Sequence, residues 1–530
     1  MMKRISVLDC TLRDGGYCNK WNFGRENISK VINSTIESGI DIVECGFITS
    51  KTICGNDVTK YNSFKEIDKI LIKHPDDKLM VAMVNYGEFD IEEIPLCNNT
   101  LLDGIRVAFH KKDMESALAY CKMIQDKGYK VFLQGMVSLS YSDKEFIDFI
   151  HNANELKPYA FYIVDSFGSM KKKELMRLFY LIENNLDEEI VVGFHSHNNT
   201  QLAYSNAQSL IETPSLRKLI IDSSVYGMGR GAGNLNTELF VEYLNDTQGA
   251  NYDIKPLLNI IDEVLSQFYE SNYWGYSLPN YLSAKHGIHP NYAMHLSEKK
   301  TLTVEAMDEI FSMIDNDKGA QYDPEYIDRL YFEYMSSGRE QSENERILRE
   351  LLGVSKVLII GPGKSAVEEQ DNLEAFIKNN NPLIISINYE HPDIESDYIF
   401  VSNLRRFREI DESKYSRVIA TSNIKNHSVY AVIEYGRLVN NNNDVADNAG
   451  LMLIKYLILC GVDKVYISGI DGYSYDYSSN YGISSMRYVA KQESIDILNE
   501  GMKKVLEEFF CSIKLEFVTS SRFSVLSIGV

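Results

Sequence analysis

The sequence has no long apolar run, no paired cysteine motif and no excess of positive charge. Its best apolar candidate, "LMLIKYLILCGV" (451–462), contains Lys455 and is shorter than the roughly 18 residues of a membrane span. The eight cysteines are scattered and form no C-x-x-C pair, which argues against a zinc knuckle or a thioredoxin-type motif. The first residues, "MMKRISVLDC", lack the apolar region of a signal peptide. We therefore predict a cytoplasmic protein whose cysteines are mostly reduced and buried.

The charge balance limits the partners of the protein. A formal charge of −21 argues against a nucleic-acid or anionic-membrane surface. Hydrophobic residues make up 44% and charged residues 24% of the chain, as in ordinary globular proteins. A chain of 530 residues exceeds the size of a single hydrophobic core, so two or three domains are expected.

From residue 5 to about 225, short β-rich runs alternate with amphipathic helical stretches. Such alternation requires right-handed crossovers and a parallel sheet. Eight units in roughly 250 residues predict a closed (β/α)8 TIM barrel. An open doubly wound sheet is the alternative, because periodicity alone does not show closure. The strand-like runs are 5–9, 41–47, 79–84, 104–109, 130–136, 160–165, 190–195 and 218–224.

The remaining chain divides into two further regions. The barrel is predicted to cover 1–250, and residues 251–352 show helical spacing and an aromatic- and histidine-rich connector, which predicts a helical extension over or beside the barrel. From 353 to 530 the β pattern returns, with eight strand-like runs from "VLIIG" to "FSVLSIG". Helices between several of these runs predict a second, Rossmann-like α/β domain.

Polar residues gather where the predicted barrel strands end. In a parallel barrel these carboxyl ends meet at one mouth. Two histidines at i and i+2, as in "GFHSHNN", face the same side of a strand and can reach one ion. Together with the Asp14 carboxylate they form a catalytic type of metal-ligand set with open positions. Taken singly, an arginine–aspartate neighbour pair or a glycine-rich turn is more often structural. The residues at these strand ends are Arg13, Asp14, Glu44, Asp165, His195, His197 and Asn234.

Five motifs occur in the predicted barrel: "LDCTLRDGGY", "VECGF", "VDSFG", "GFHSHNN" and "SVYGMGRGAGN". They resemble those of the DRE-TIM metallolyase superfamily, and are most similar to those of the 4-hydroxy-2-oxovalerate aldolases. The resemblance spans about residues 1–290. It implies that Asp14, His195 and His197 bind Mn²⁺ or Mg²⁺, with Asn234 in or beside the metal shell. It also implies that Arg13 stabilises an enolate oxygen and that Glu44 holds Arg13 in place. Both a cation and a fixed guanidinium stabilise charge that forms on a carbonyl oxygen.

Tyr17 stands where the resembling aldolases carry an acid/base histidine. A phenol ordinarily titrates near pH 10, so it is a poor base but a serviceable proton donor. The candidates for the proton acceptor are His286, His289 and Tyr292, in "AKHGIHPNYA", although ordinary packing is the commoner role for each. For substrate binding we predict His110, Asp165 and Ser166.

The C-terminal region contains "VLIIGPGKSA", a G-x-G-x-x-A pattern between a strand and a helix. This context suits phosphate binding, and a tight structural turn is the alternative. Neighbouring segments vaguely resemble the Rossmann-like domains of the motility accessory factor and sialyltransferase-like families. That likeness implies a nucleotide or activated sugar, and a role in carbohydrate or surface-polysaccharide metabolism. The predicted contacts are Gly361, Gly363, Lys364, Ser365 and Asp471.

Three functions are compatible with these patterns. The leading one is a metal-dependent aldolase that cleaves or forms a 4-hydroxy-2-oxo acid from a 2-oxo acid and an aldehyde. The second is a Claisen-type lyase or synthase that uses an acyl-CoA. The third is a nucleotide- or sugar-binding protein with a degenerate barrel, against which the intact Arg13, Asp14 and histidine pair argue. A homo-oligomer is expected.

Overall fold

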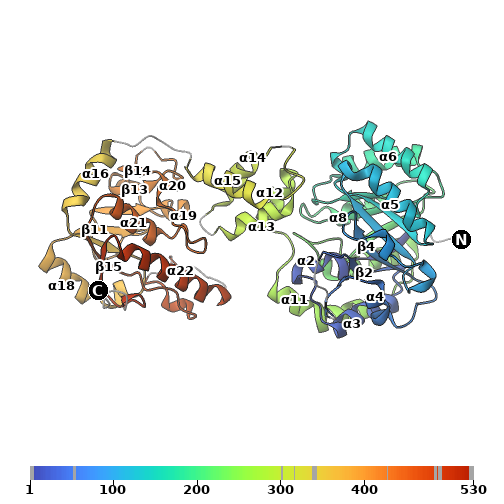
Figure 1. Ribbon diagram of the computed structural model, residues 1–530, viewed down its shortest axis with the longest axis horizontal. Helices are drawn as coiled ribbons and strands as arrows, with labels where there is room; N and C mark the ends of the chain where they lie inside the picture. Colours follow the sequence, from blue (N-terminus) through green and yellow to red (C-terminus); the bar gives the residue numbers. More distant parts are fainter. Residues whose placement is uncertain are drawn as a thin grey trace. The chain divides into compact units, whose positions relative to one another are not determined.

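The structure, a computed structural model, describes residues 5–51, 55, 57–299, 302–315, 317–336, 343–426, 428–482, 486 and 492–524. The chain forms two compact units (Figure 1). The first contains residues 1–295 and 315–322, and the second contains 296–314 and 323–530. The helical segment 251–352, expected as one extension, is therefore divided between the two units.

The first unit is a closed parallel barrel. Its strands follow the order β1-β9-β8-β7-β6-β5-β4-β2, and β1 also pairs with β2, which closes the sheet and excludes the open alternative. All eight predicted strands are present. The two-residue strand β3 (Lys60–Tyr61), which the sequence reading missed, extends the sheet beyond β2. The barrel strands are β1 (Ile5–Asp9), β2 (Ile42–Ile48), β4 (Leu79–Asn85), β5 (Gly104–Phe109), β6 (Lys130–Gly135), β7 (Ala160–Asp165), β8 (Val191–Ser196) and β9 (Leu219–Ser223).

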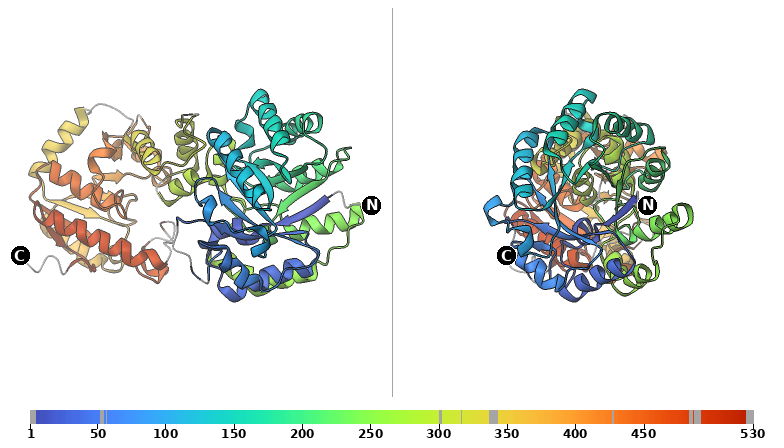
Figure 2. Two further views of the ribbon diagram at one scale, coloured as in Figure 1. Left: turned by 45° about the vertical axis from the view of Figure 1, so that its right-hand side comes forward. Right: turned by 90° about the vertical axis from the view of Figure 1, so that its right-hand side faces the viewer.

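Helices surround the barrel (Figure 2). In α7, Leu175, Leu178, Phe179 and Ile182 are buried at helical spacing, so one face packs against the strands. Helix α6 begins with a capping box in which Ser142 and Glu145 satisfy each other's backbone N–H groups. The helices of the barrel are α1 (Thr11–Asp14), α2 (Gly16–Asn19), α3 (Arg25–Glu37), α4 (Phe64–Leu71), α5 (Met114–Asp126), α6 (Asp143–Leu156), α7 (Lys172–Asn185), α8 (Ala203–Glu212) and α9 (Thr237–Gln248).

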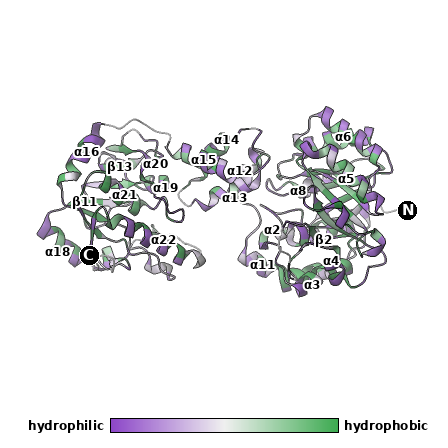
Figure 3. Ribbon diagram, in the orientation of Figure 1, coloured by the Kyte–Doolittle hydropathy of each residue, from purple (hydrophilic) through white to green (hydrophobic). Residues whose placement is uncertain are grey.

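The barrel interior has its own apolar cluster. Leu8, Val81, Phe132, Tyr162 and Ile220 belong to this cluster, which contains no helical residue. Figure 3 shows the strands as predominantly hydrophobic, with hydrophilic residues on the surrounding helices. Because the strands are buried on both sides, their sequences are continuous apolar runs and do not alternate between apolar and polar residues.

A helical region follows the barrel. Its segments are α10 (Lys255–Ile260), a π-helical turn (Ile261–Leu265), α11 (Ser266–Ser271), α12 (Leu278–Lys285), α13 (Pro290–Glu298), α14 (Val304–Ser312), α15 (Pro324–Ser336) and α16 (Glu343–Val354). None of the helices in the described ranges is both long and apolar enough to cross a membrane.

The second unit contains an open parallel sheet of seven strands in the order β14-β13-β12-β11-β10-β15-β16. The strand order reverses between β10 and β15. The eighth predicted strand, "FSVLSIG", lies mostly outside the described residues. The strands are β10 (Val357–Ile360), β11 (Leu383–Ile387), β12 (Tyr398–Val401), β13 (Val418–Thr421), β14 (Ala431–Ile433), β15 (Lys464–Ser468) and β16 (Lys514–Phe517).

The apolar run near residue 455 forms helix α21 (Ala449–Leu459), most of whose side chains are buried. Lys455 donates a hydrogen bond to the carbonyl of Val439. The run is therefore a core helix of the second unit. The other helices of this unit are α17 (Ser365–Glu368), α18 (Gln370–Asn380), α19 (Leu404–Phe407), α20 (Tyr435–Leu438) and α22 (Gln492–Phe510).

Candidate metal and enolate site

Three potential metal ligands meet at the carboxyl end of the barrel. Asp14 ends α1, the single turn that follows β1, while His195 and His197 lie at the end of β8. Their ligand atoms all lie within 4.8 Å of one another, and all three residues are buried. The loop after β9 brings Asn234 to the same place, where its Nδ2 donates to Asp14 Oδ2 at 2.6 Å.

The group has unused hydrogen-bonding capacity that a cation would satisfy. His197 Nδ1 and Asn234 Oδ1 are buried and have no hydrogen-bond partner among the described residues. His197 Nδ1 lies 3.6 Å from Asp14 Oδ2. His195 Nδ1 contacts Asp222 Oδ2 at 2.9 Å, an arrangement that orients the ring and leaves Nε2 for an ion. Two imidazoles and a carboxylate therefore fit a divalent metal ion.

The electrostatics favour the ligand forms of these side chains. Burial alone would raise the pKa of Asp14, but the positive charge of Arg13 and the neighbouring His197 outweigh it and lower this pKa. Burial lowers the pKa of His197 to about 3, although Asp14 opposes the shift. At neutral pH the site thus presents an ionised carboxylate and a neutral imidazole, which are the forms that bind metals.

Gly229 is required by close packing at this site. A Cβ atom at this position would lie 2.2 Å from Asn234 Nδ2 and 2.9 Å from Asp14 Oδ2. The glycine therefore lets the loop after β9 approach the Asp14 carboxylate, and it places the next residue, Arg230, beside the site.

A chain of buried ion pairs connects Arg13 to the histidine ligand. Glu44 Oε2 accepts from Arg13 Nε at 2.9 Å and from Arg106 Nη1 at 2.7 Å. Arg106 also donates to Asp222, which in turn contacts His195. Burial would raise the pKa of Asp222, but Arg106 and His195 lower it. The predicted contact between Glu44 and Arg13 is present.

Sequence reasoning missed Arg106 and Asp222. Each is a charged residue inside an otherwise apolar strand, in "GIRVAF" and "KLIIDSS". Buried charges of this kind need partners, so their presence in predicted barrel strands was an available signal.

A cavity of about 260 Å³ opens beside this group. It brings together four residues predicted from the sequence and one that was missed: Tyr17, His110, Ser166, His289 and Arg230. Tyr17 is 39% exposed. Ser166 Oγ accepts from the Val137 N–H at 2.8 Å. Burial lowers the pKa of His289 to about 3 and also lowers that of His110, so both imidazoles are neutral at physiological pH.

Other candidates have different surroundings. The Tyr292 hydroxyl donates towards the carbonyls of Lys318 and Gln321, and neither Tyr292 nor His286 lines this cavity in the described structure. The Asp165 carboxylate accepts the N–H groups of Ser169 and Met170, which fixes the loop after β7. Burial raises the pKa of Asp165 to about 7.

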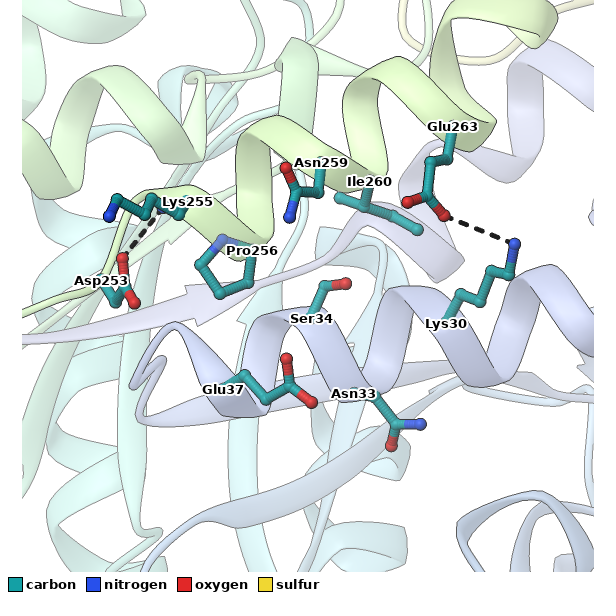
Figure 4. Close-up of a pocket in the computed structure, with 10 residues that line it drawn as sticks. All are labelled: Lys30, Asn33, Ser34, Glu37, Asp253, Lys255, Pro256, Asn259, Ile260 and Glu263. Atoms are coloured by element: carbon teal, nitrogen blue, oxygen red, sulfur yellow. Dashed lines mark hydrogen bonds and ion pairs between the residues drawn. The ribbon is translucent and has the colours of Figure 1, made fainter.

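A surface hollow of about 310 Å³ lies elsewhere on the barrel, between α3 and the α10 region (Figure 4). Polar side chains and one ion pair, Lys30 with Glu263 at 3.5 Å, surround it. None of the three candidate metal ligands lines either cavity, and this hollow also lacks every other residue predicted for the site.

The glycine-rich loop of the second unit lies at the reversal between β10 and β15, a position where open α/β sheets bind ligands. Here, however, Asp471 accepts from the Ser365 N–H at 2.8 Å and from Ser365 Oγ at 2.6 Å. A Cβ atom on Gly363 would lie 2.5 Å from the Gly469 carbonyl oxygen. Lys364 pairs with Glu368 at 2.9 Å. A phosphate would have to displace the Asp471 carboxylate, and the nucleotide site stays a prediction.

The family comparison identifies the barrel. A family described as HMGL-like matches residues 4–264. This match covers just under half of the chain and ends before the second unit begins. Enzymes of this DRE-TIM family use a divalent metal ion, and the Asp14–His195–His197 group is where this HMGL-like barrel could hold one.

Individual relatives match about half of the chain. A 4-hydroxy-2-oxovalerate aldolase of Bacillus cereus is 26% identical over 255 residues, covering 47% of this chain and 72% of that protein. An oxaloacetate decarboxylase of Mycobacterium tuberculosis is 23% identical over 238 residues, covering 45% and 69%. Among solved structures, the N-terminal domain of a putative aldolase from Bacteroides vulgatus has 28% identity and a TM-score of 0.47, covering 55% of this chain and 96% of that one.

Proposed function

We propose that the HMGL-like barrel is a divalent-metal-dependent aldolase that cleaves or forms a 4-hydroxy-2-oxo acid, with pyruvate and an aldehyde as the smaller partners. The observation that carries the proposal is the buried Asp14–His195–His197 group with Arg13 directly beside it. The relatives' names support it, since both refer to bond cleavage in a 2-oxo acid. The proposed ion is Mn²⁺ or Mg²⁺, as the resemblance of the motifs to the DRE-TIM metallolyases implies; the two imidazoles and the carboxylate fit a divalent ion of either kind or another.

Arg13 is the residue proposed to stabilise the enolate. In the cleavage direction, the C4 hydroxyl loses its proton and the C3–C4 bond breaks. The electrons of that bond form the C2–C3 double bond and leave negative charge on the C2 oxygen, the aldehyde departs, and C3 then takes up a proton. Arg13 Nη2 is buried and has no partner among the described residues, so it has an N–H group available for this oxygen. A bound metal ion would add Lewis-acid stabilisation of the same charge.

Two residues of the cavity can take part in proton transfer at the C4 hydroxyl, His289 as acceptor and Tyr17 as donor. His289 is neutral there and lies beside Arg230, at 3.3 Å between Nε2 and Nη1. Tyr17 lines the same cavity and has a hydroxyl that can donate to the departing oxygen. We assign the acceptor role to His289 and the donor role to Tyr17. His289→Gln should then reduce cleavage more than it reduces substrate binding.

The first experiment measures exchange of the pyruvate methyl protons in D₂O with Mg²⁺, followed by proton NMR. We expect metal-dependent exchange that falls at least about 100-fold in Asp14→Ala, because both the metal and its charge balance are lost. Asp126→Ala is the matched control, since Asp126 is an exposed residue of α5 paired with Lys122.

Two other outcomes of this experiment would change the proposed substrate. If the metal binds but pyruvate does not exchange, the proposed substrate is wrong. Exchange of the acetyl-CoA methyl protons in its place would favour the acyl-CoA alternative. The homo-oligomer and the ligand of the second unit stay predictions.

A further inference from the structure

Arg230 extends from the glycine-rich loop after β9 into the cavity beside the metal ligands. Its Nη1 lies 3.3 Å from His289 Nε2, and its Nη2 donates to the Ser166 carbonyl at 3.2 Å. Its guanidinium carbon lies 5.1 Å from the centre of the Tyr17 ring. The guanidinium is thus held in place by neutral groups.

No carboxylate contacts the Arg230 guanidinium directly. Throughout the described ranges, no carboxylate forms an ion pair with Arg230 within 4.0 Å, and its Nε is buried without a hydrogen-bond partner. Asp14 interacts with it only at longer range. Two buried arginines of the barrel differ, since Arg13 and Arg106 each contact two carboxylates. A partly buried cation without a counter-ion is costly, and it is a common device for binding an anion.

The remaining cavity charges leave this role open. Glu88 accepts from Thr49 Oγ1 at 3.2 Å and lies 3.8 Å from Lys51, so its charge is balanced locally. Asp113 lines the cavity beside His110. The neutral imidazole of His110 can donate an N–H group to an anion near Arg230, whereas His289 Nδ1 already accepts from the Asn291 N–H at 3.2 Å.

We propose that Arg230, with His110, binds an anionic group of the aldehyde partner, a carboxylate or a phosphate. The inference rests on the proposed aldolase function and specifies its substrate class. The 2-oxo acid is assigned to Arg13 and the metal ligands, so Arg230 is left for the second substrate. The cavity of about 260 Å³ holds a short anionic aldehyde.

The test compares aldehydes of matched length in aldol synthesis with pyruvate. The pairs are succinate semialdehyde with butanal and glyoxylate with acetaldehyde, and glycolaldehyde phosphate distinguishes a phosphate from a carboxylate. The wild type should prefer the anionic member of a pair by about 10- to 100-fold in kcat/KM, as expected for a hydrogen-bonded charge pair. Arg230→Ala should abolish this preference and Arg230→Lys should keep part of it. Arg177→Ala, at an exposed arginine paired with Asp143, is the control.

Two results would overturn the proposal. The first is equal use of neutral and anionic aldehydes by the wild type. The second is a raised KM for pyruvate exchange in Arg230→Ala, which would assign Arg230 to the 2-oxo acid.

Calorimetric titration with succinate and with inorganic phosphate separates this inference from the aldolase function. If pyruvate does not exchange but either anion binds only when Arg230 is present, the aldolase function is wrong and the anion site stands. If neither anion binds the wild type more tightly than Arg230→Ala, the anion site is wrong.

Discussion

Both units carry polar residues at the carboxyl ends of parallel strands, yet the residues at the barrel mouth and those at the β10–β15 reversal differ in how far their hydrogen bonds are satisfied. At the barrel mouth, His197 Nδ1, Asn234 Oδ1 and Arg13 Nη2 are buried without hydrogen-bond partners in the described structure. At the β10–β15 reversal, the Asp471 carboxylate binds both the N–H and the hydroxyl of Ser365, whose hydroxyl also contacts Thr519 at 2.8 Å.

The difference shows that position in a fold is a weaker guide to a site than unsatisfied hydrogen-bonding capacity. A buried polar atom without a partner costs free energy unless a ligand satisfies it. The barrel mouth therefore favours an added cation and anion, while the reversal in the second unit is already satisfied by its own carboxylate.

The largest expected effect comes from breaking the ion-pair chain of the barrel. Arg106→Met removes the partner that Glu44 and Asp222 share. We expect a loss of about 3–5 kcal/mol in the free energy of unfolding, because the two buried carboxylates lose the cation that they share, and only Glu44 keeps an arginine partner, Arg13. Urea denaturation measures it. Arg177→Met should change stability by less than about 0.5 kcal/mol. A similarly small change for Arg106→Met would contradict the structural role of this chain.

Adding a metal ion should stabilise the barrel and leave the stability of the second unit unchanged. Mn²⁺ at 100 times its dissociation constant should stabilise the barrel by about 2.7 kcal/mol, because the ion binds the folded site. Hydrogen exchange should slow in peptides covering 191–236 and stay unchanged in 357–368, and a chelator should reverse the effect. His197→Ala should abolish the response, and the exposed His151→Ala should retain it. Equal protection of both segments would show that the two sites are not different.

The barrel was predictable because each β/α unit leaves a local signal. Strands such as 104–109 and 160–165 are short apolar runs bounded by turns, and the ligand residues directly follow such runs. The closure of the sheet depends on the long-range pairing of β1 with β2, which no local pattern encodes.

The residues that sequence reasoning missed act through long-range contacts. Arg106 finds its partners on β2 and β9, 62 and 116 residues away. Arg230 lies in a non-periodic loop, where spacing does not show which way a side chain points. The helices of 251–352 are divided between two units, which the sequence does not encode locally, because an apolar helix face does not reveal which body it packs against.

A smaller effect is expected at the strand reversal of the second unit. Ser365→Ala removes one donor to Asp471 and should cost about 1–2 kcal/mol in unfolding free energy at pH 7. Burial already raises the pKa of Asp471, and hydrogen bonds from Ser365 partly oppose this. A raised carboxyl pKa stabilises the fold at low pH, and this contribution is lost as pH rises through the folded-state pKa. The cost of Ser365→Ala should therefore be larger at pH 7 than at pH 4. Ser512→Ala, at an exposed serine, should show no such pH dependence.

The smallest effect is expected for Lys364→Ala, which removes a surface partner of Glu368. Urea denaturation should show no measurable change in the free energy of unfolding, because an exposed i,i+4 ion pair is weak and screened.

The same variant, Lys364→Ala, tests the predicted nucleotide site, since a lysine beside a phosphate would contribute to affinity. Titration with CMP and with a UDP sugar should give equally weak binding for the wild type and Lys364→Ala, because the Asp471 carboxylate occupies the Ser365 donors. Micromolar binding that Lys364→Ala abolishes would show that a phosphate displaces this carboxylate. The second unit would then resemble the barrel in having a ligand site at its strand ends.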